Sequence, residues 1–354
     1  MRTYFAILIF SAMATFLATP LVRRLAFRLG AVDLPSLRKI HREPMPRFGG
    51  LAVFFGFCSP WAGFYVLDNR ITAAFQDYER LFLALIVGAM AMLVLGMWDD
   101  LKGLSPMKKL MWQKAVAAGL YFSGYQVTAL SNPFGAPLEL GWLSLPVSIL
   151  WIVGITNAIN LLDGIDGLAA GVTACIALSL GLIHILTGDI IVALLTLCLA
   201  GACLGFLPFN FAPARIFLGD CGSLFIGIVL ACVSMFSLFK GTTAVLVVVP
   251  LILFGLPLVD TTSVVLGRLW RGQPLFQGDK MHLHHRLLKL GLTQQQAAFF
   301  LYVVTTLLGS AAVWVSVEQT PHSLILVAGL ILVLAGLAWL VWRRIRHWFN
   351  LNQE

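Results

Sequence analysis

Long apolar stretches separated by short polar loops form the dominant pattern along this chain. Most stretches are near 20 residues long, which is the length of a helix that crosses the hydrocarbon core of a bilayer. A helix satisfies its own backbone hydrogen bonds, so an all-α bundle is the fold expected in lipid. We predict about eleven transmembrane helices, at roughly 4–22, 48–67, 81–98, 110–130, 143–159, 168–187, 190–208, 219–239, 244–266, 297–317 and 323–342.

The composition excludes a soluble globular protein. Of 354 residues, 59% are hydrophobic and 11% are charged, whereas soluble domains carry about 25% charged residues. We therefore predict a polytopic integral membrane protein that forms a single transmembrane domain over 1–354. The first stretch lacks the basic start and the cleavage site of a signal peptide, so we interpret it as a retained helix. The six cysteines lie mostly inside apolar stretches without C-x-x-C spacing, which indicates core residues rather than disulfides or a zinc site.

The net charge of +8 reflects membrane topology and not a nucleic-acid partner. With the N-terminus outside and the C-terminus cytoplasmic, the inner loops and tail hold 20 of the 24 Lys and Arg residues. The opposite orientation would reverse this bias, against the positive-inside rule. Every chemically suggestive loop then lies on the cytoplasmic side. These active-site loops are at about 23–47, 99–109, 157–167, 209–223 and 267–296.

The loop NAINLLDGIDG, at 157–167, places amides and acids between two apolar stretches. An ionised Asp at mid-bilayer would cost about 2.5–3.5 kcal/mol on insertion scales, so these acids belong at the interface or in a wet cavity. In a helix Asn157, Asn160 and Asp163 would share one face, because residues three apart are neighbours. The segment contains no Lys or Arg, so neither Asp163 nor Asp166 has a basic partner nearby in the sequence. Carboxylate and amide oxygens without such a partner suit Mg²⁺. The alternative is a polar turn at the interface.

WDDLKG supplies a second pair of acids, Asp99 and Asp100, at the end of the third span. Adjacent helical residues point about 100° apart, so the two carboxylates are expected to serve different partners. One could bind a cation while the other accepts a proton from a nucleophile. The structural alternative is a helix end neutralised by Lys102, Lys108 or Lys109, although acids there oppose the helix dipole.

NFAPARIFLGDCGS brings Asn210, Arg215, Asp220 and Ser223 to the same side. Asp220 begins an apolar span, where exposed backbone N–H groups favour phosphate. Asp220 could hold a metal that bridges to that phosphate. The alternative is an ordinary helix N-cap.

GDKMHLHHRL contains His282, His284 and His285. We expect His282 and His285 to share a helical face and His284 to point elsewhere. A zinc site would need acid or thiol ligands as well. Nearby basic residues, Arg268 among them, favour an anionic ligand such as a phosphate or nucleotide.

RKIHREPMPRFGG is a basic loop in which Lys39, Arg42 and Arg47 would meet an anionic lipid headgroup. The alternative is plain anchoring by positive charge. Asp260, after Pro257 in the ninth span, is an acid at membrane depth. It could bond to the backbone freed by the proline, and its role is open at this point.

Five motifs in this order resemble the cytoplasmic motifs of the polytopic polyprenyl-phosphate N-acetylhexosamine-1-phosphate transferases. The resemblance rests on RKIHREPMPRFGG, WDDLKG, NAINLLDGIDG, NFAPARIFLGDCGS and HLHHRL, and it runs from about Val22 to Leu292. In the branch that makes the first peptidoglycan lipid the histidines are consecutive, whereas here Leu283 interrupts them. This favours the bacterial undecaprenyl-phosphate GlcNAc-1-phosphate transferase branch.

The resemblance implies transfer of a sugar 1-phosphate, with GlcNAc-1-phosphate favoured, from a UDP-sugar to undecaprenyl phosphate. UMP leaves, and the product is the first membrane intermediate of a cell-envelope polysaccharide such as O-antigen. The expected location is the bacterial cytoplasmic (inner) membrane, with Mg²⁺ as cofactor and Mn²⁺ as its substitute. Membrane lipids are expected partners, and a homodimer is one expected assembly.

The resemblance also implies roles for individual residues. Asp220 is the first metal ligand, with Asp163 beside it, and Asp99 or Asp100 acts on the lipid phosphate. The expected substrate contacts are Asn157, Asn160, Asp166, Asn210, His282, His284, His285, Lys39, Arg42, Arg47 and Arg268.

Three alternatives stand beside this interpretation. The first is the same chemistry on another UDP-amino sugar, including UDP-MurNAc-pentapeptide. The second is an ion-coupled transporter, which would place acids near mid-span in broken helices. The third is a non-catalytic partner in envelope assembly. Convergence of the acids and histidines in one pocket would favour the enzyme.

Overall fold

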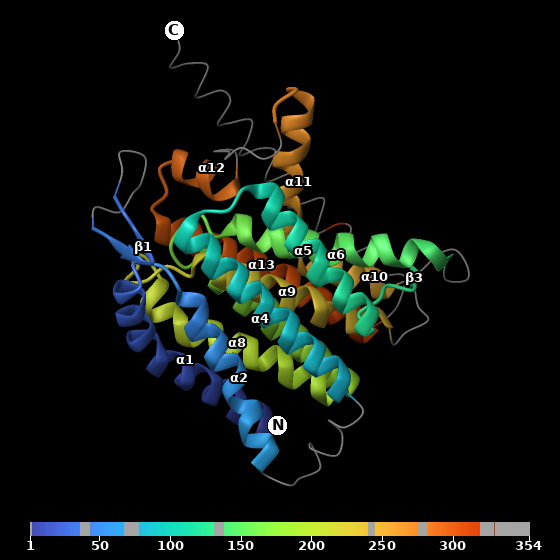
Figure 1. Ribbon diagram of the computed structural model, residues 1–354. Coiled ribbons are helices and arrows are strands. Elements are labelled where there is room, and N and C mark those ends of the chain that lie inside the picture. The colour runs from blue at the N-terminus through green and yellow to red at the C-terminus, as the bar shows by residue number, and fades with distance from the viewer. Residues whose placement is uncertain are drawn as a thin grey trace.

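The computed structural model describes residues 2–35, 43–66, 78–130, 138–239, 245–274 and 282–318, together with Gly329. This part of the chain is almost entirely helical (Figure 1). The helices are α1 Arg2–Arg28, α2 Gly49–Val66, α4 Glu79–Lys102, α5 Pro106–Ser123, α6 Ser144–Leu162, α7 Leu168–Thr187, α8 Ile190–Asn210, α9 Gly219–Phe239, α10 Val245–Leu253, α11 Gly255–Trp270, α12 Leu283–Lys289 and α13 Gln294–Glu318. Two short antiparallel pairs join β1 Val32–Asp33 to β2 Met45–Pro46 and β3 Ala129–Leu130 to β4 Leu138–Glu139.

Six described helices are long and apolar enough to cross a membrane: α1, α4, α6 with the turn before it, α7, α8 and α13. The apolar parts of α2 and α9 are shorter. The protein is therefore a multi-pass helical membrane protein. The predicted spans agree well with α7 and α9, and the eleventh, at 323–342, lies outside the described residues.

The predicted ninth span, at 244–266, is not one helix. Phe254 interrupts it, so that α10 and α11 are separate elements. Pro257 has no N–H, so it cannot donate to the carbonyl of Leu253 four residues earlier. In Figure 1, α11 extends away from the body of the bundle.

Helix α9 forms the centre of the bundle, and all of its residues from Leu224 to Met235 are buried. Neighbouring helices approach its first turn closely through glycines. A Cβ added at Gly96 of α4 would lie 2.3 Å from the Cys221 backbone, and one at Gly50 of α2 would lie 2.2 Å from Gly222. Small residues permit this backbone contact between membrane helices. The beginning of α9, where Asp220 lies, is thus enclosed by α2 and α4.

Candidate active site

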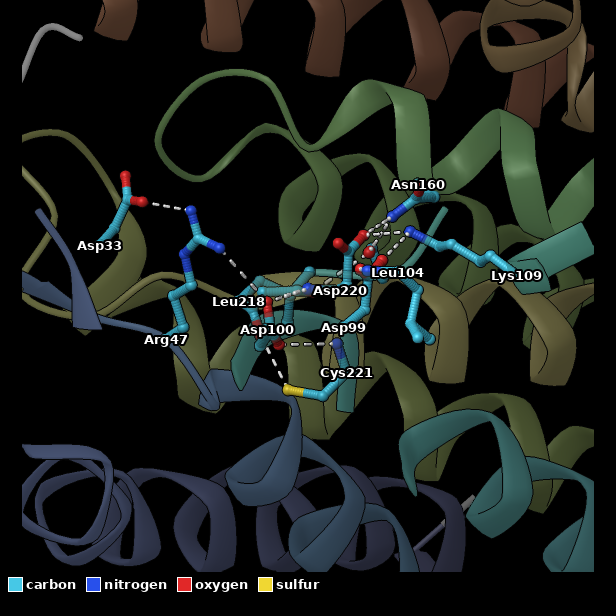
Figure 2. Close-up of polar contacts among 12 residues, drawn as sticks. Asp33, Arg47, Asp99, Asp100, Leu104, Lys109, Asn160, Leu218, Asp220 and Cys221 are labelled. Carbon is cyan, nitrogen blue, oxygen red and sulfur yellow. Dashed lines mark hydrogen bonds and ion pairs between the residues drawn. The ribbon is translucent and has the colours of Figure 1, made fainter. Parts of the chain in front are cut away.

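The carboxylate of Asp100 caps the beginning of α9 from the end of α4. Its Oδ1 accepts the N–H of Asp220 at 3.0 Å, and its Oδ2 accepts the N–H of Cys221 at 3.1 Å (Figure 2). A negative charge at a helix N-terminus satisfies unpaired N–H groups and is favoured by the helix dipole. The expectation that these N–H groups are open to phosphate is therefore wrong for two of them. Asp100 instead sets the position of Asp220.

Lys109 of α5 lies between two acids from different helices. Its Nζ is 2.8 Å from Asp99 Oδ2 and 2.8 Å from Asp220 Oδ1. Asp99 also accepts the N–H of Leu104 at 2.6 Å. Burial disfavours the ammonium form, but Asp220 and Asp99 outweigh it and raise the pKa of Lys109, so the side chain is a cation at neutral pH. Asp99 and Asp100 do serve different partners, as predicted.

Asn160 of α6 adds a third contact to Asp220. Its Nδ2 donates to Asp220 Oδ1 and, at 2.7 Å, to Ser223 Oγ. Two helices, α5 through Lys109 and α6 through Asn160, therefore hold the same oxygen of the Asp220 carboxylate on α9. Figure 2 shows these side chains converging on Asp220.

A cavity of about 710 Å³ opens beside Asp220. All five predicted active-site loops contribute to its wall, including 23–47 through Arg47 and 267–296 through His285. The acids that line it outnumber the bases. The acids are Asp33, Asp100, Asp163, Asp166 and Asp220, and the described bases are Arg47 and His285.

The surroundings of Asp163 in this cavity disfavour its anionic form. It follows the last residue of α6, so it is just outside the helix on which we expected it. Burial raises its pKa well above the usual range, and the charges of Asp220 and Asp100 raise it further, while Arg47 lowers it. No hydrogen bond to its carboxylate is formed by the described residues. A cation would relieve this arrangement.

The second acid of the loop, Asp166, joins two parts of the cavity wall. Its Oδ2 accepts the N–H of Ala214 at 2.9 Å. Asn210 lies in the same segment as Ala214 and is buried. Its side-chain amide donates to the carbonyl of Ile216 at 3.0 Å. Its Oδ1 has no hydrogen-bond partner within the described chain. The Oδ1 atom of Asn210 is therefore available to accept a hydrogen bond from a donor outside the described chain, such as a ligand.

Asp260 has a defined partner in the histidine motif. Its Oδ2 lies 2.8 Å from His282 Nδ1, and its Oδ1 accepts the N–H of Leu283 at 2.6 Å. The acid of α11 thus fixes both a histidine and the first N–H of α12. The role of Asp260 is therefore to position the histidine motif. Since the acid has these partners, it no longer supports a transporter.

The three histidines are arranged differently from the predicted helical face. His282 precedes α12, and its ring stacks on that of His284 with a 5.6 Å centroid separation and a 6° interplanar angle. His285, 4.4 Å from His284 between ring centroids, is the one that lines the cavity. Burial, with the neighbouring histidines, lowers the pKa of His284 to about 4. His284 is therefore neutral at pH 7, and its ring packs between His282 and His285.

We expect Gly164→Ala to destabilise the protein through His284. An added Cβ would lie 2.3 Å from His284 Nε2, so one of the two must move. Overpacking of this kind costs about 1–3 kcal/mol, which thermal unfolding in detergent would register as a lower Tm. In a His284→Ala background the same change at Gly164 should lower Tm by much less, because the clashing ring is absent. An equal loss of Tm in both backgrounds would contradict the contact.

Some predicted site residues lie elsewhere. Asn157 exchanges hydrogen bonds with Gln113 of α5, at 2.6 and 3.3 Å, and does not line the cavity. Arg268 is buried and donates to the carbonyl of Pro274. Arg47 does line the cavity, paired with Asp33 and 4.0 Å from Asp100. Lys39 and Arg42 lie outside the described residues.

Three residues that contribute to the site carry no signal in the sequence that marks them as site residues. In the sequence Lys109 is one of three lysines that could neutralise a helix end. Nothing in its local pattern distinguishes it from Lys108. The glutamines at the start of α13, Gln294 and Gln295, line the cavity but carry no charge and no motif.

Comparison with known proteins gives a consistent result. The family described as glycosyl transferase family 4 matches residues 82–238. A Bacillus subtilis protein named "Probable undecaprenyl-phosphate N-acetylglucosaminyl 1-phosphate transferase" is 39% identical over 87% of this chain and 86% of its own. A Mycobacterium tuberculosis decaprenyl-phosphate N-acetylglucosaminephosphotransferase is 35% identical over 83% of this chain and 78% of its own. An Escherichia coli undecaprenyl-phosphate alpha-N-acetylglucosaminyl 1-phosphate transferase is 28% identical over 87% and 82%.

Proposed function

Because this chain belongs to glycosyl transferase family 4, together with the polyprenyl-phosphate N-acetylglucosamine-1-phosphate transferases, we propose that it transfers GlcNAc-1-phosphate from UDP-GlcNAc to undecaprenyl phosphate. It is a phosphotransferase rather than a transporter. In the proposed reaction an oxygen of the lipid phosphate forms a bond to the phosphorus that carries the sugar. The bond from that phosphorus to the bridging oxygen breaks, and UMP leaves. The observation that carries the proposal is the acid-lined cavity at Asp220, to which all five loops contribute.

The residues present fit a magnesium ion. Asp220 and Asp163 would hold it, since both line the cavity and lie close enough to interact electrostatically. No cluster of three His, Cys, Asp or Glu side chains is arranged as a metal site in the described part of the chain. Mg²⁺ does not need one, because it commonly takes one or two carboxylates and completes its shell with water and substrate phosphate. When bound, Mg²⁺ would neutralise charge on the diphosphate.

The chain's own residues have separate tasks in this proposal. Asp100 holds the first turn of α9 and so orients Asp220. Lys109 supplies a positive charge beside the carboxylates, which offsets part of the repulsion between two anionic substrates. Arg47 and His285 provide further donors on the cavity wall. A phosphate has a second pKa of about 6, so the lipid phosphate needs no general base at pH 7.

The proposed location is the bacterial cytoplasmic membrane, with the cavity on the cytoplasmic side. The basic residues of the loops that form the cavity support this orientation. We expect a reporter fused after Lys289 to be cytoplasmic, as an accessibility assay in cells would measure. An external signal would reject the orientation.

GlcNAc is the proposed sugar for two reasons. The relatives named above are all N-acetylglucosamine transferases, and Leu283 interrupts the consecutive histidines expected of the UDP-MurNAc-pentapeptide branch. The experiment therefore compares UDP-GlcNAc with other UDP-sugars.

The test uses the purified full-length protein in detergent with undecaprenyl phosphate, Mg²⁺ and a panel of UDP-sugars. We expect UMP release with UDP-GlcNAc that depends on both the lipid and Mg²⁺. Release from another UDP-amino sugar alone would change the donor. No release from any of them would reject the enzyme assignment.

A further inference from the structure

Helix α13 begins at the wall of the cavity, although none of the sequence motifs lies on it. Thr293, Gln294 and Gln295 all line the cavity. The start of the helix is fixed by a reciprocal pair of bonds: Thr293 N–H donates to Gln296 Oε1 at 2.9 Å, and Gln296 N–H donates to Thr293 Oγ1 at 3.2 Å. This is a capping box, which satisfies the N–H groups of Thr293 and Gln296 at the start of the helix. The side chains of Gln294 and Gln295 are thus not needed for capping.

Those two side chains bond instead to the backbones of two different cavity loops. Gln294 Oε1 accepts the N–H of Asp166 at 3.3 Å. Gln295 Nε2 donates to the carbonyl of Ala212 at 2.6 Å. The two loops are also joined directly, since Asp166 Oδ2 accepts the N–H of Ala214. Three segments therefore form a closed set of hydrogen bonds around one side of the cavity.

Tyr302 fixes the helix to the same loop a second time. Its hydroxyl donates to the carbonyl of Gly167 at 2.6 Å. Its ring occupies the space beside Gly171 of α7, where an added Cβ would lie 2.2 Å from the ring carbon Cζ. With contacts at Gln294 and eight residues later at Tyr302, α13 can neither slide nor rotate against the loop without breaking a bond.

We propose that α13 acts as a clamp on the two loops, and that Gln294 and Gln295 are positioning residues for binding of the sugar nucleotide. The inference rests on the proposed function for the identity of that ligand. The loops contain Asp163, Asp166 and Asp220 between them, so their spacing sets the distance between the acids of the cavity. The clamp contacts no residue of the Asp99–Lys109 pair.

The directions of the two hydrogen bonds are opposite, and this makes the proposal testable. A backbone N–H can only donate and a carbonyl can only accept, so position 294 requires an acceptor and position 295 requires a donor. Glutamate offers acceptors only, and lysine offers donors only. Glutamate should therefore be tolerated better at 294 than at 295, and lysine better at 295 than at 294. Within each pair the added charge is the same and lies on the same wall.

The experiment compares Gln294→Glu with Gln295→Glu, and Gln294→Lys with Gln295→Lys, in the full-length protein. The KM for UDP-GlcNAc is measured at saturating undecaprenyl phosphate, and the Kd for UDP-GlcNAc is measured by calorimetry without the lipid. We expect Gln295→Glu to bind about three- to tenfold more weakly than Gln294→Glu, the effect of one lost hydrogen bond, and the order to reverse in the lysine pair. The KM for undecaprenyl phosphate should differ by less than about twofold within each pair.

Ser310→Ala is the matched control. Ser310 is exposed on the same helix, and its hydroxyl donates to the carbonyl of Thr306 in the helix itself, so both constants should be unchanged. The clamp would be overturned if the same position tolerated both glutamate and lysine better. It would also be overturned if the KM and Kd for UDP-GlcNAc were equal within both pairs. If the wild-type protein binds UDP-GlcNAc but releases no UMP, the proposed function is rejected. The clamp is then still tested by comparing the Kd for UDP-GlcNAc within each pair of variants. Failure of the wild-type protein to bind UDP-GlcNAc would overturn both.

Discussion

Asp220→Asn is expected to lower kcat by about 10²–10³-fold, a loss typical for removal of one electrostatic contact in an active site. Asparagine has the same shape, and its carbonyl oxygen can still accept from Asn160 and Lys109. What disappears is the negative charge that would hold a divalent cation. The UMP-release assay measures the effect, and the apparent KM for Mg²⁺ should rise with it. The fold should be unaffected, because Asp100 still caps α9 through backbone N–H groups.

The comparison variant is Asp189→Asn, an identical chemical change at the beginning of α8, where Asp189 lies 3.5 Å from His184. It should retain wild-type turnover. Similar elution from size exclusion and a similar Tm for both variants would show that neither is misfolded. Near-normal turnover by Asp220→Asn would remove Asp220 from the metal site.

Lys109→Met is expected to lower turnover and, at the same time, to raise the affinity for Mg²⁺. The ammonium is 2.8 Å from both Asp99 and Asp220, so its loss leaves two partly buried carboxylates without their shared counterion. Turnover should fall about 10²-fold, because a positive charge near the reacting phosphates is lost. Mg²⁺ should bind more tightly, because Lys109 no longer competes for Asp220. Titration of UMP release against Mg²⁺ measures both effects.

Lys108→Met is the control for this change. Lys108 is the preceding residue on α5 and is exposed, so the variant has the same net charge without disturbing the carboxylates. Its kcat and its KM for Mg²⁺ should match the wild type. A parallel loss of turnover and of Mg²⁺ affinity in Lys109→Met would contradict competition between lysine and metal.

The transmembrane architecture was largely predictable because each apolar stretch carries its own length signal. The predicted spans at 168–187 and 219–239 coincide with α7 and α9. The break at Phe254 was not predicted, because Leu253, Phe254 and Gly255 are as apolar as the rest of the stretch. Hydropathy measures transfer into lipid and is insensitive to a single missing backbone hydrogen bond.

The membership of the site was predictable in part. Acids at membrane depth need a reason to be there, so Asp99, Asp100, Asp163 and Asp220 were recognisable, and the structure brings Asp100, Asp163 and Asp220 to one cavity. The partners were not recognisable. Lys109 resembles any basic residue of a cytoplasmic loop, and Gln294 and Gln295 resemble any polar helix start.

The sequence by itself determined that this protein is a helical membrane protein, and it predicted five loops that share one cavity wall. Hydrophobicity and charge are properties of each residue, and they act on topology without regard to the neighbours in space. Only the tertiary structure decided which acid caps a helix and which one pairs with a lysine. Asp99 and Asp100 are adjacent in the chain, yet one pairs with Lys109 and the other holds the start of α9. The task of a carboxylate depends on which donors lie within about 3 Å of it, and those donors come from helices that are distant in the sequence.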